Sequence, residues 1–261
     1  MSELHKYLDD VPPLKGNQFY KCASCMHAKS KQRSYSTPST AIKGVHQDTT
    51  SETTVPGQNF YMDFGFMRGS GYCSKDEEGR TITSIDGYRS YLIVLDKATR
   101  YLWVFLTKTK APPTNILEMF LKEDGNPTVT RRTIRTDEES ELWASHAFKT
   151  AALDAGYLLE PTASGAPFQN GLGERPNQTL GTMVRCLLHS ANLGPEFWSY
   201  ALVHAVYLKN RLPHAALTTT PYEAYTRKRP SARHLRVFGC PVIAKNPGKR
   251  PAKLDIHTSA G

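Results

Sequence analysis

One aspartate inside an aromatic strand sets the strongest constraint on how this chain can fold. The stretch QNFYMDFGFMRG, residues 58–69, alternates large apolar side chains with other residues at the two-residue period of a β-strand. Asp63 lies in the middle of it. A buried carboxylate is costly unless a cation or a hydrogen-bond donor pairs with it. Asp63 therefore lies either on the solvated face of an edge strand or in a site that supplies such a partner.

The order of the apolar segments predicts a mixed α/β sheet with helices on its faces. The turn KATR joins two strands, 88–96 and 101–107, and the following helix ends at Gly125. After it come a strand at 131–137, a helix at 141–156, a strand at 157–160, and helices at 174–191 and 194–213. Proline is tolerated in the first turn of a helix. Pro176 therefore predicts a helix that begins close to Glu174.

Two further carboxylates occupy positions comparable to that of Asp63. Asp137 closes the predicted strand 131–137, and Glu174 follows it after 36 intervening residues, at the predicted start of a helix. Hard oxygen ligands of this kind suit Mg²⁺ or Mn²⁺. Two such ions can activate the attacking oxygen and stabilise the leaving oxygen of an in-line phosphoryl transfer. In a chain with 24 acidic residues, the alternative is that these three are ordinary surface acids.

The positive charge is concentrated at the two flanks of the chain. The net charge is +9; residues 15–45 carry six Lys and Arg with no acid, and residues 227–253 carry nine, again with no acid. Such flanks are typical of arms that bind a polyanion, although general solubility explains them equally well. Five cysteines, an odd number, favour a reducing compartment. We see neither an 18-residue apolar run nor a secretory leader, so we expect no membrane partner.

Six segments together resemble the integrase region of copia-type long-terminal-repeat retrotransposon Gag-Pol polyproteins. They lie within residues 58–245 and are FYMDFGFM, YLIVLDKATRYLWVFLT, IRTDEESEL, GAPFQNGLGERPNQTLGTMVRCLL, FWSYALVHAVYLKNRLPH and PSARHLRVFGCPV. The resemblance implies a ribonuclease-H-like fold, with Asp63, Asp137 and Glu174 as the catalytic, metal-binding residues. It also implies processing of the element's 3′ DNA ends and their transfer to target DNA.

The same resemblance carries expectations about partners and location. It implies double-stranded DNA, both element ends and target, as the partner, and a homo-oligomer, because two ends must be joined together. It implies function in the nucleus after passage through a cytoplasmic particle. We also expect the chain to be a fragment of a longer polyprotein. Two alternatives stay open: a ribonuclease H, and a decayed or co-opted remnant that binds DNA without activity.

The basic leader contains half of a zinc-site pattern. In the family a His-His-Cys-Cys zinc module precedes the catalytic core, and Cys22 and Cys25 resemble its second half. His5 and His27 do not match the expected histidine pair, and a structural Zn²⁺ takes four ligands. We therefore expect two free thiols rather than an intact zinc site.

Three regions follow from this division of the chain. They are a basic leader and linker at 1–57, a catalytic core at 58–226 and a basic C-terminal extension at 227–261. Within the core, the candidate DNA-binding residues on the helix after Glu174 are Arg175, Asn177, Gln178 and Arg185. We expect them to contact phosphates, because phosphate contacts supply most of non-specific affinity. The alternative for each one is ordinary polar helix surface.

Overall fold

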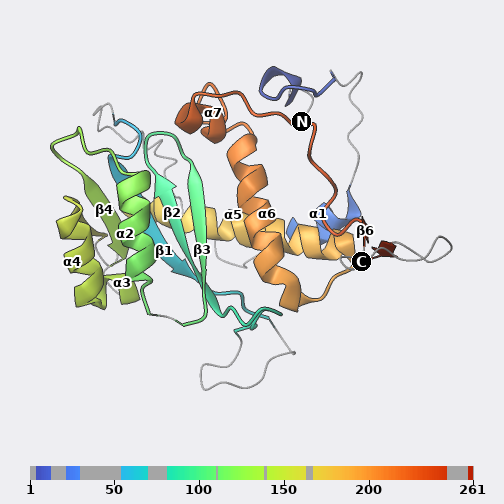
Figure 1. Ribbon diagram of the computed structural model, residues 1–261, viewed down its shortest axis with the longest axis horizontal. Coiled ribbons are helices and arrows are strands. Elements are labelled where there is room, and N and C mark those ends of the chain that lie inside the picture. The colour runs from blue at the N-terminus through green and yellow to red at the C-terminus, as the bar shows by residue number, and fades with distance from the viewer. Residues whose placement is uncertain are drawn as a thin grey trace, which may run out of the picture.

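A five-stranded mixed sheet forms the centre of the protein in the computed structural model (Figure 1). The structure describes residues 4–12, 22–29, 54–69, 81–109, 111–137, 140–162, 167–245 and 258–260; within these ranges, only the backbone is described at 162, 167–175, 243–245 and 258–260. The strands are β1 (Asn59–Gly65), β2 (Ser90–Asp96), β3 (Leu102–Thr107), β4 (Thr133–Asp137) and β5 (Leu158–Thr162). Their order across the sheet is β3-β2-β1-β4-β5.

The directions of the strands confirm the predicted fold class. β1, β2 and β3 form an antiparallel meander, whereas β4 pairs parallel to β1 and β5 pairs parallel to β4. An antiparallel hairpin extended by parallel strands, with crossover helices, is the mixed α/β arrangement of a ribonuclease-H-like sheet. The hairpin turn falls at residues 97–101, where the sequence predicts it.

Helices cover both faces of this sheet (Figure 1). On one face lie α2 (Thr114–Glu123), α3 (Glu141–Ala144) and α4 (His146–Asp154). On the other lie α5 (Pro167–Ala191) and α6 (Trp198–Arg211), the latter preceded by the 3₁₀ turn η2 (Pro195–Phe197). Among the described residues, no helix combines the length and apolar character needed to cross a bilayer.

The alternation along β1 sorts its side chains between two apolar cores. Phe60, Met62 and Phe64 pack with residues of α2, α3 and α4. Tyr61 packs instead with residues of α5 and α6. Because successive strand residues point to opposite faces, Asp63 shares the face of Tyr61. β1 lies between β2 and β4, so it is a central strand of a sheet that is covered on both faces. The interpretation of Asp63 as a residue on the solvated face of an edge strand is therefore wrong.

Two predicted helix boundaries differ from the structure. The expected helix 141–156 is interrupted at Ser145, whose hydroxyl accepts a hydrogen bond from the Phe148 N–H at 3.2 Å and caps α4. The helix expected to begin near Glu174 begins instead at Pro167, and Pro176 lies inside it. Pro176 has no N–H to give to the carbonyl four residues earlier. In a 25-residue helix, propagation on both sides tolerates that one missing bond.

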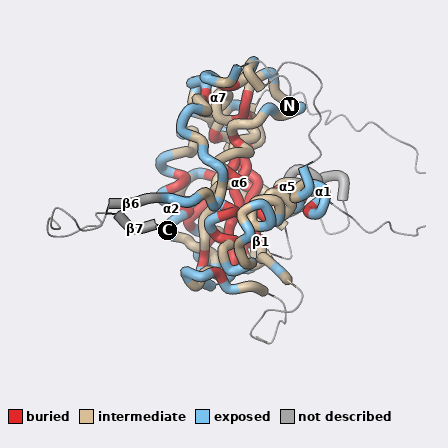
Figure 2. Tube along the Cα trace, turned by 90° about the vertical axis from the view of Figure 1, so that its right-hand side faces the viewer, coloured by how far each residue is buried: buried red, intermediate tan, exposed pale blue. Residues whose placement is uncertain are grey.

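The leader contacts both the C-terminal extension and the core. The turn η1 (Leu4–Lys6) precedes Asp9, whose carboxylate lies 3.1 Å from Nε of Arg229, just after α7 (Pro221–Thr226). The helix α1 (Ala23–Lys29) packs against α5 (Figure 2). A small hairpin of β6 (Ile243–Lys245) and β7 (Thr258–Ala260) ends the described chain. The basic leader therefore contains η1 and α1, while the boundaries at 57 and 226 stay predictions.

Candidate active site

The sheet brings Asp63 and Asp137 to neighbouring positions. β1 and β4 run parallel, with Tyr61 opposite Arg135 as the last paired positions. Two residues further along each strand, this register places Asp63 opposite Asp137, the final residue of β4. An Arg135 Nη1 atom donates to the Tyr61 hydroxyl at 3.3 Å, so both side chains lie on the same face. By the two-residue period, Asp63 and Asp137 share that face, and both are half-buried.

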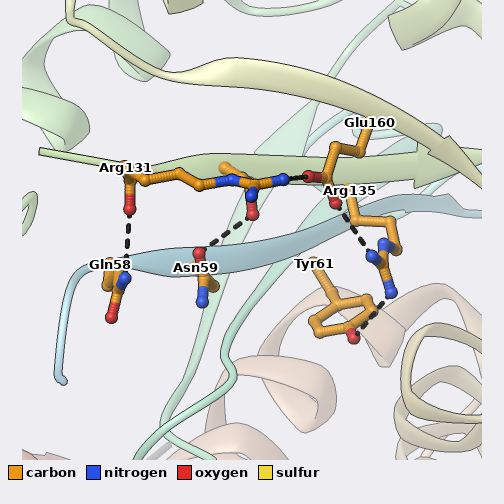
Figure 3. Close-up of polar contacts among 7 residues, drawn as sticks. Gln58, Asn59, Tyr61, Arg131, Arg135 and Glu160 are labelled. Atoms are coloured by element: carbon orange, nitrogen blue, oxygen red, sulfur yellow. Dashed lines mark hydrogen bonds and ion pairs between the residues drawn. The ribbon is translucent and has the colours of Figure 1, made fainter. Parts of the chain in front are cut away.

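A group of polar contacts holds β1, β4 and β5 in this register (Figure 3). Arg135 links the three strands, because it donates to Tyr61 on β1 and to Glu160 on β5, the latter at 2.8 Å. Nearer the start of the strands, the Thr133 hydroxyl donates to Oδ1 of Asn59 at 2.9 Å. Gln58 donates to the Arg131 carbonyl at 3.0 Å. These bonds oppose a slip between β1 and β4 that would separate the two aspartates.

A third group reaches Asp63 from α5. The Asn177 Nδ2 atom donates a hydrogen bond of 2.6 Å to Oδ2 of Asp63. The other polar atom of the amide, Oδ1, is buried and has no hydrogen-bond partner among the described residues. Glu174 precedes Asn177 by three residues, a spacing that places both positions on one face of a helix. The side chain of Glu174 itself lies outside the described residues.

Gly65, two residues after Asp63 on β1, is tightly packed. Tyr91 of β2 lies across Gly65, and a Cβ atom at Gly65 would come within 2.1 Å of its Cζ. Burial raises the pKa of Tyr91, and the negative charge of Asp63 raises it further. Tyr91 therefore stays a neutral phenol beside the carboxylate. Position 65 requires glycine because the tyrosine ring occupies the space of a side chain.

The donor set fits a hard divalent cation. Carboxylate oxygens of two aspartates and an unpartnered amide oxygen, all at one end of the sheet, are the ligand types that Mg²⁺ and Mn²⁺ take. Among the described residues, no group of three or more His, Cys, Asp or Glu side chains is arranged to hold a metal. With Glu174 outside the described side chains, its part in such a site stays a prediction.

The candidate DNA-binding residues differ in their surroundings. Gln178 is exposed on α5, whereas the side chain of Arg175 lies outside the described residues. Asn177 is bound to Asp63. Arg185 is held by the leader, since its Nη2 atom donates to the Ala28 carbonyl at 3.2 Å and to the Thr182 hydroxyl at 3.1 Å. Phosphate contact by any of the four stays a prediction.

The candidate zinc residues lie at the contact between α1 and α5. Cys22 and Cys25 are free thiols, and a hydrogen bond between them raises the pKa of Cys25 to about 11. Cys186 of α5 also bonds to Cys25. The rings of His27 and His189 stack with their centroids 5.2 Å apart. The Ser24 hydroxyl forms a hydrogen bond of 3.0 Å with Nδ1 of His189. The leader thiols therefore face the long helix that also carries Glu174 and Asn177.

The role of Asn177 beside Asp63 is the feature that sequence reasoning missed. We expected Asn177 to contact phosphate, and the structure places its amide on a candidate metal ligand instead. The signal that could have revealed it is the three-residue spacing from Glu174, which puts both side-chain positions on the face that meets β1.

Comparison with known proteins identifies relatives for most of the chain. No protein-family model matches. The chain is 35% identical over 177 residues to the retrovirus-related Pol polyprotein from transposon TNT 1-94 of Nicotiana tabacum, a match that covers 67% of the chain. It is 32% identical over 171 residues to that of transposon RE2 of Arabidopsis thaliana, covering 65%. It is 28% identical over 226 residues to that of transposon RE1 of the same plant, covering 86%.

These matches take up 13%, 12% and 14% of the three polyproteins, so the chain spans a small part of the curated relatives it matches. Among solved structures, the HTLV-2 integrase catalytic core domain, a trimeric form in complex with magnesium, is similar to this chain with a TM-score of 0.45 and 14% identity. That similarity covers 66% of this chain and 97% of the other.

Proposed function

We propose that this chain, which belongs to the retrovirus-related Pol polyproteins of copia-type transposons, is the integrase core of such an element. It processes the 3′ ends of the element's DNA and joins them to target DNA by in-line phosphoryl transfer. The observation that carries the proposal is the parallel register of β1 and β4, whose last pair, Tyr61 and Arg135, lies two residues before Asp63 and Asp137 on the two strands.

In this proposal Asp63, Asp137 and Glu174 hold Mg²⁺ or Mn²⁺. Held by these residues, such cations would supply the Lewis-acid chemistry of the phosphoryl transfer. The chain's own residues prepare the site. Asn177 donates a hydrogen bond to one Asp63 oxygen and thereby fixes the orientation of the carboxylate.

The partners in this proposal are double-stranded element ends and target DNA, and the chain acts as a homo-oligomer. Gln178 and Arg175 precede the point where α5 meets α1, so they contact phosphates near the carboxylates. The basic flanks at 15–45 and 227–253 neutralise further phosphates. We place the reaction in the nucleus, after passage through a cytoplasmic particle. Zn²⁺ has no part in this proposal, because the leader supplies only half of the usual ligand set.

The test is a strand-transfer reversal assay on a branched DNA substrate, with the purified chain and Mn²⁺. We expect joining of the nicked strand in the unchanged chain, and a loss of at least about a hundredfold in Asp63→Asn and in Glu174→Gln, since both remove a cation ligand. Asp154→Asn, at an exposed acid of α4 on the opposite face of the sheet, is the matched control and should retain activity.

Three other outcomes lead elsewhere. Equal activity of the two variants and the unchanged chain would contradict the assignment of the site. Cleavage restricted to the RNA strand of a hybrid would identify a ribonuclease H. Metal-independent DNA binding without any cleavage or joining would identify a DNA-binding remnant.

A further inference from the structure

A cavity of about 940 Å³ opens beside α6, away from the two aspartates. One wall is the outer face of α6, with Tyr200 and Tyr207, and another is the segment 234–238 that follows α7. Tyr88 and Phe238 complete a lining in which aromatic rings predominate. The Phe238 ring lies 5.4 Å from the ring of His204. The volume of the cavity lies within the range of pockets that bind small molecules or single residues of a polymer.

The floor of this cavity contains a polar atom without a partner. Ser199 is 1% exposed and lines the cavity, and its Oγ atom has no hydrogen-bond partner among the described residues. Leaving a buried hydroxyl unsatisfied costs free energy that a ligand with a polar edge would recover. Burial also lowers the pKa of His204, so its ring is neutral near pH 7 and offers a donor and an acceptor.

The charges around the cavity favour an anionic ligand. Arg236 and His234 line it, and Lys108 lies 5.9 Å above the Tyr88 ring. Asp86 is the one acid among the lining residues, and its carboxylate is bonded to the Tyr200 hydroxyl. The wall at 234–238 belongs to residues 227–253, which carry nine bases and no acid. Aromatic rings interleaved with cations are the usual surface for stacking unpaired bases while neutralising phosphates.

The cavity also lies at the same end of the sheet as Asp63 and Asp137. In β2 and β3, Ser90 pairs with Thr107, beyond the level at which Gly65 pairs with Tyr91. Tyr88 and Lys108 therefore project past the end of β1 at which Asp63 lies. A nucleic-acid strand that leaves the carboxylates toward α6 would reach the rings of the cavity.

We propose that this cavity binds an unpaired nucleobase of a single-stranded DNA segment, with the base between Tyr200 and its neighbouring rings. The polar edge of the base contacts Ser199, and its phosphates contact Arg236 and Lys108. The proposal extends the proposed function, since it names single-stranded DNA as a second feature that the same end of the fold recognises. Binding needs no metal and no catalysis, so it is tested apart from that function.

The experiment is fluorescence anisotropy of the full chain with a short labelled oligothymidylate and, separately, a blunt duplex, without divalent metal. Tyr200, 52% exposed at the rim, can be replaced without disturbing the core. We expect Tyr200→Ala to weaken single-strand binding by about fivefold or more, as for loss of one stacked base, and duplex binding by less. Met119→Ala, at an exposed site of α2 on the other face, is the matched control.

Two more variants extend the test. Ser199→Ala should lower single-strand affinity while leaving the urea midpoint unchanged or higher, because it removes an unsatisfied hydroxyl. Arg236→Gln should weaken single-strand binding more than Lys122→Gln on α2 does. Unchanged single-strand affinity in both Tyr200→Ala and Ser199→Ala overturns the proposal. So does a change confined to self-association by sedimentation, which would mean that a second copy of the chain fills the cavity.

Discussion

The hydrogen bond from Asn177 to Asp63 allows the most direct test of the candidate active site. At 2.6 Å it joins an amide donor to a carboxylate, and bonds of this charge-assisted kind contribute about 1.5–3 kcal/mol. Asp63 is half-buried, so water can replace part of the lost interaction in Asn177→Ala. We therefore take the lower end of that range, which corresponds to about a tenfold smaller fraction of molecules with the carboxylate correctly oriented.

The assay is strand-transfer reversal at a series of Mn²⁺ concentrations. Because a bound cation also orients the carboxylate, we expect Asn177→Ala to react about tenfold more slowly at low Mn²⁺ and to recover most of that loss at saturation. The half-saturating concentration of Mn²⁺ should therefore rise. Thr179→Ala, at an exposed residue two positions further along α5, is the matched control for helix stability. Rates for Asn177→Ala within about twofold of the unchanged chain at every Mn²⁺ concentration would refute the positioning role.

Three further predictions concern stability and pH. Asp96→Ala should lower the free energy of unfolding by about 3 kcal/mol in urea titrations, because the buried N–H groups of Gly57 and Thr99 lose their acceptor; Asp96→Asn should lose less. Gly65→Ala should cost about 2 kcal/mol by overpacking against Tyr91, and Tyr91→Leu in the same chain should recover part of it. His214 has a pKa below its ordinary 6.5, through burial first and then the charges of Lys209 and Arg100. The His214 ring therefore binds a proton more readily in the unfolded chain than in the folded one. The contribution of His214 to the free energy of unfolding is complete above about pH 6.5 and declines as the pH falls from there through the lowered pKa. The decline in urea midpoint from about pH 7.5 to about pH 5.5 should be smaller in His214→Gln, and an equal decline would contradict this assignment.

The strands of the core could be predicted because their pattern is local. The alternation of Phe60, Met62 and Phe64 with Tyr61 and Asp63 is the two-residue period of a strand, and both faces found apolar partners. The end of β4 at Asp137 was likewise visible in the sequence, and the parallel register then follows from the pairing with β1. Which strands neighbour each other is a long-range property, and the sequence expectation rested there on the resemblance.

The helix boundaries were less predictable because caps compete with periodicity. The pattern of 141–156 continues through Ser145, yet the Ser145 hydroxyl forms a cap and starts a new helix. At Pro176 the local rule favoured a helix start, whereas Leu180 and Val184 anchor a helix that extends past the proline in both directions. A proline inside a helix costs about 3 kcal/mol, through the lost hydrogen bond and the crowding of the carbonyl four residues earlier, and the packing of a long helix outweighs that cost here.

The long helix α5 connects the candidate active site to the leader. Its first half carries Glu174 and Asn177, and its second half carries Arg185 and His189, which bind the carbonyl of Ala28 and the side chain of Ser24 in α1. Between them Leu180 and Val184 are buried against the sheet. A helix held at its middle and its far end has little freedom to rotate about its axis, and rotation is the motion that would carry Asn177 away from Asp63. Through α1, the leader therefore contributes to the position of Asn177 relative to Asp63.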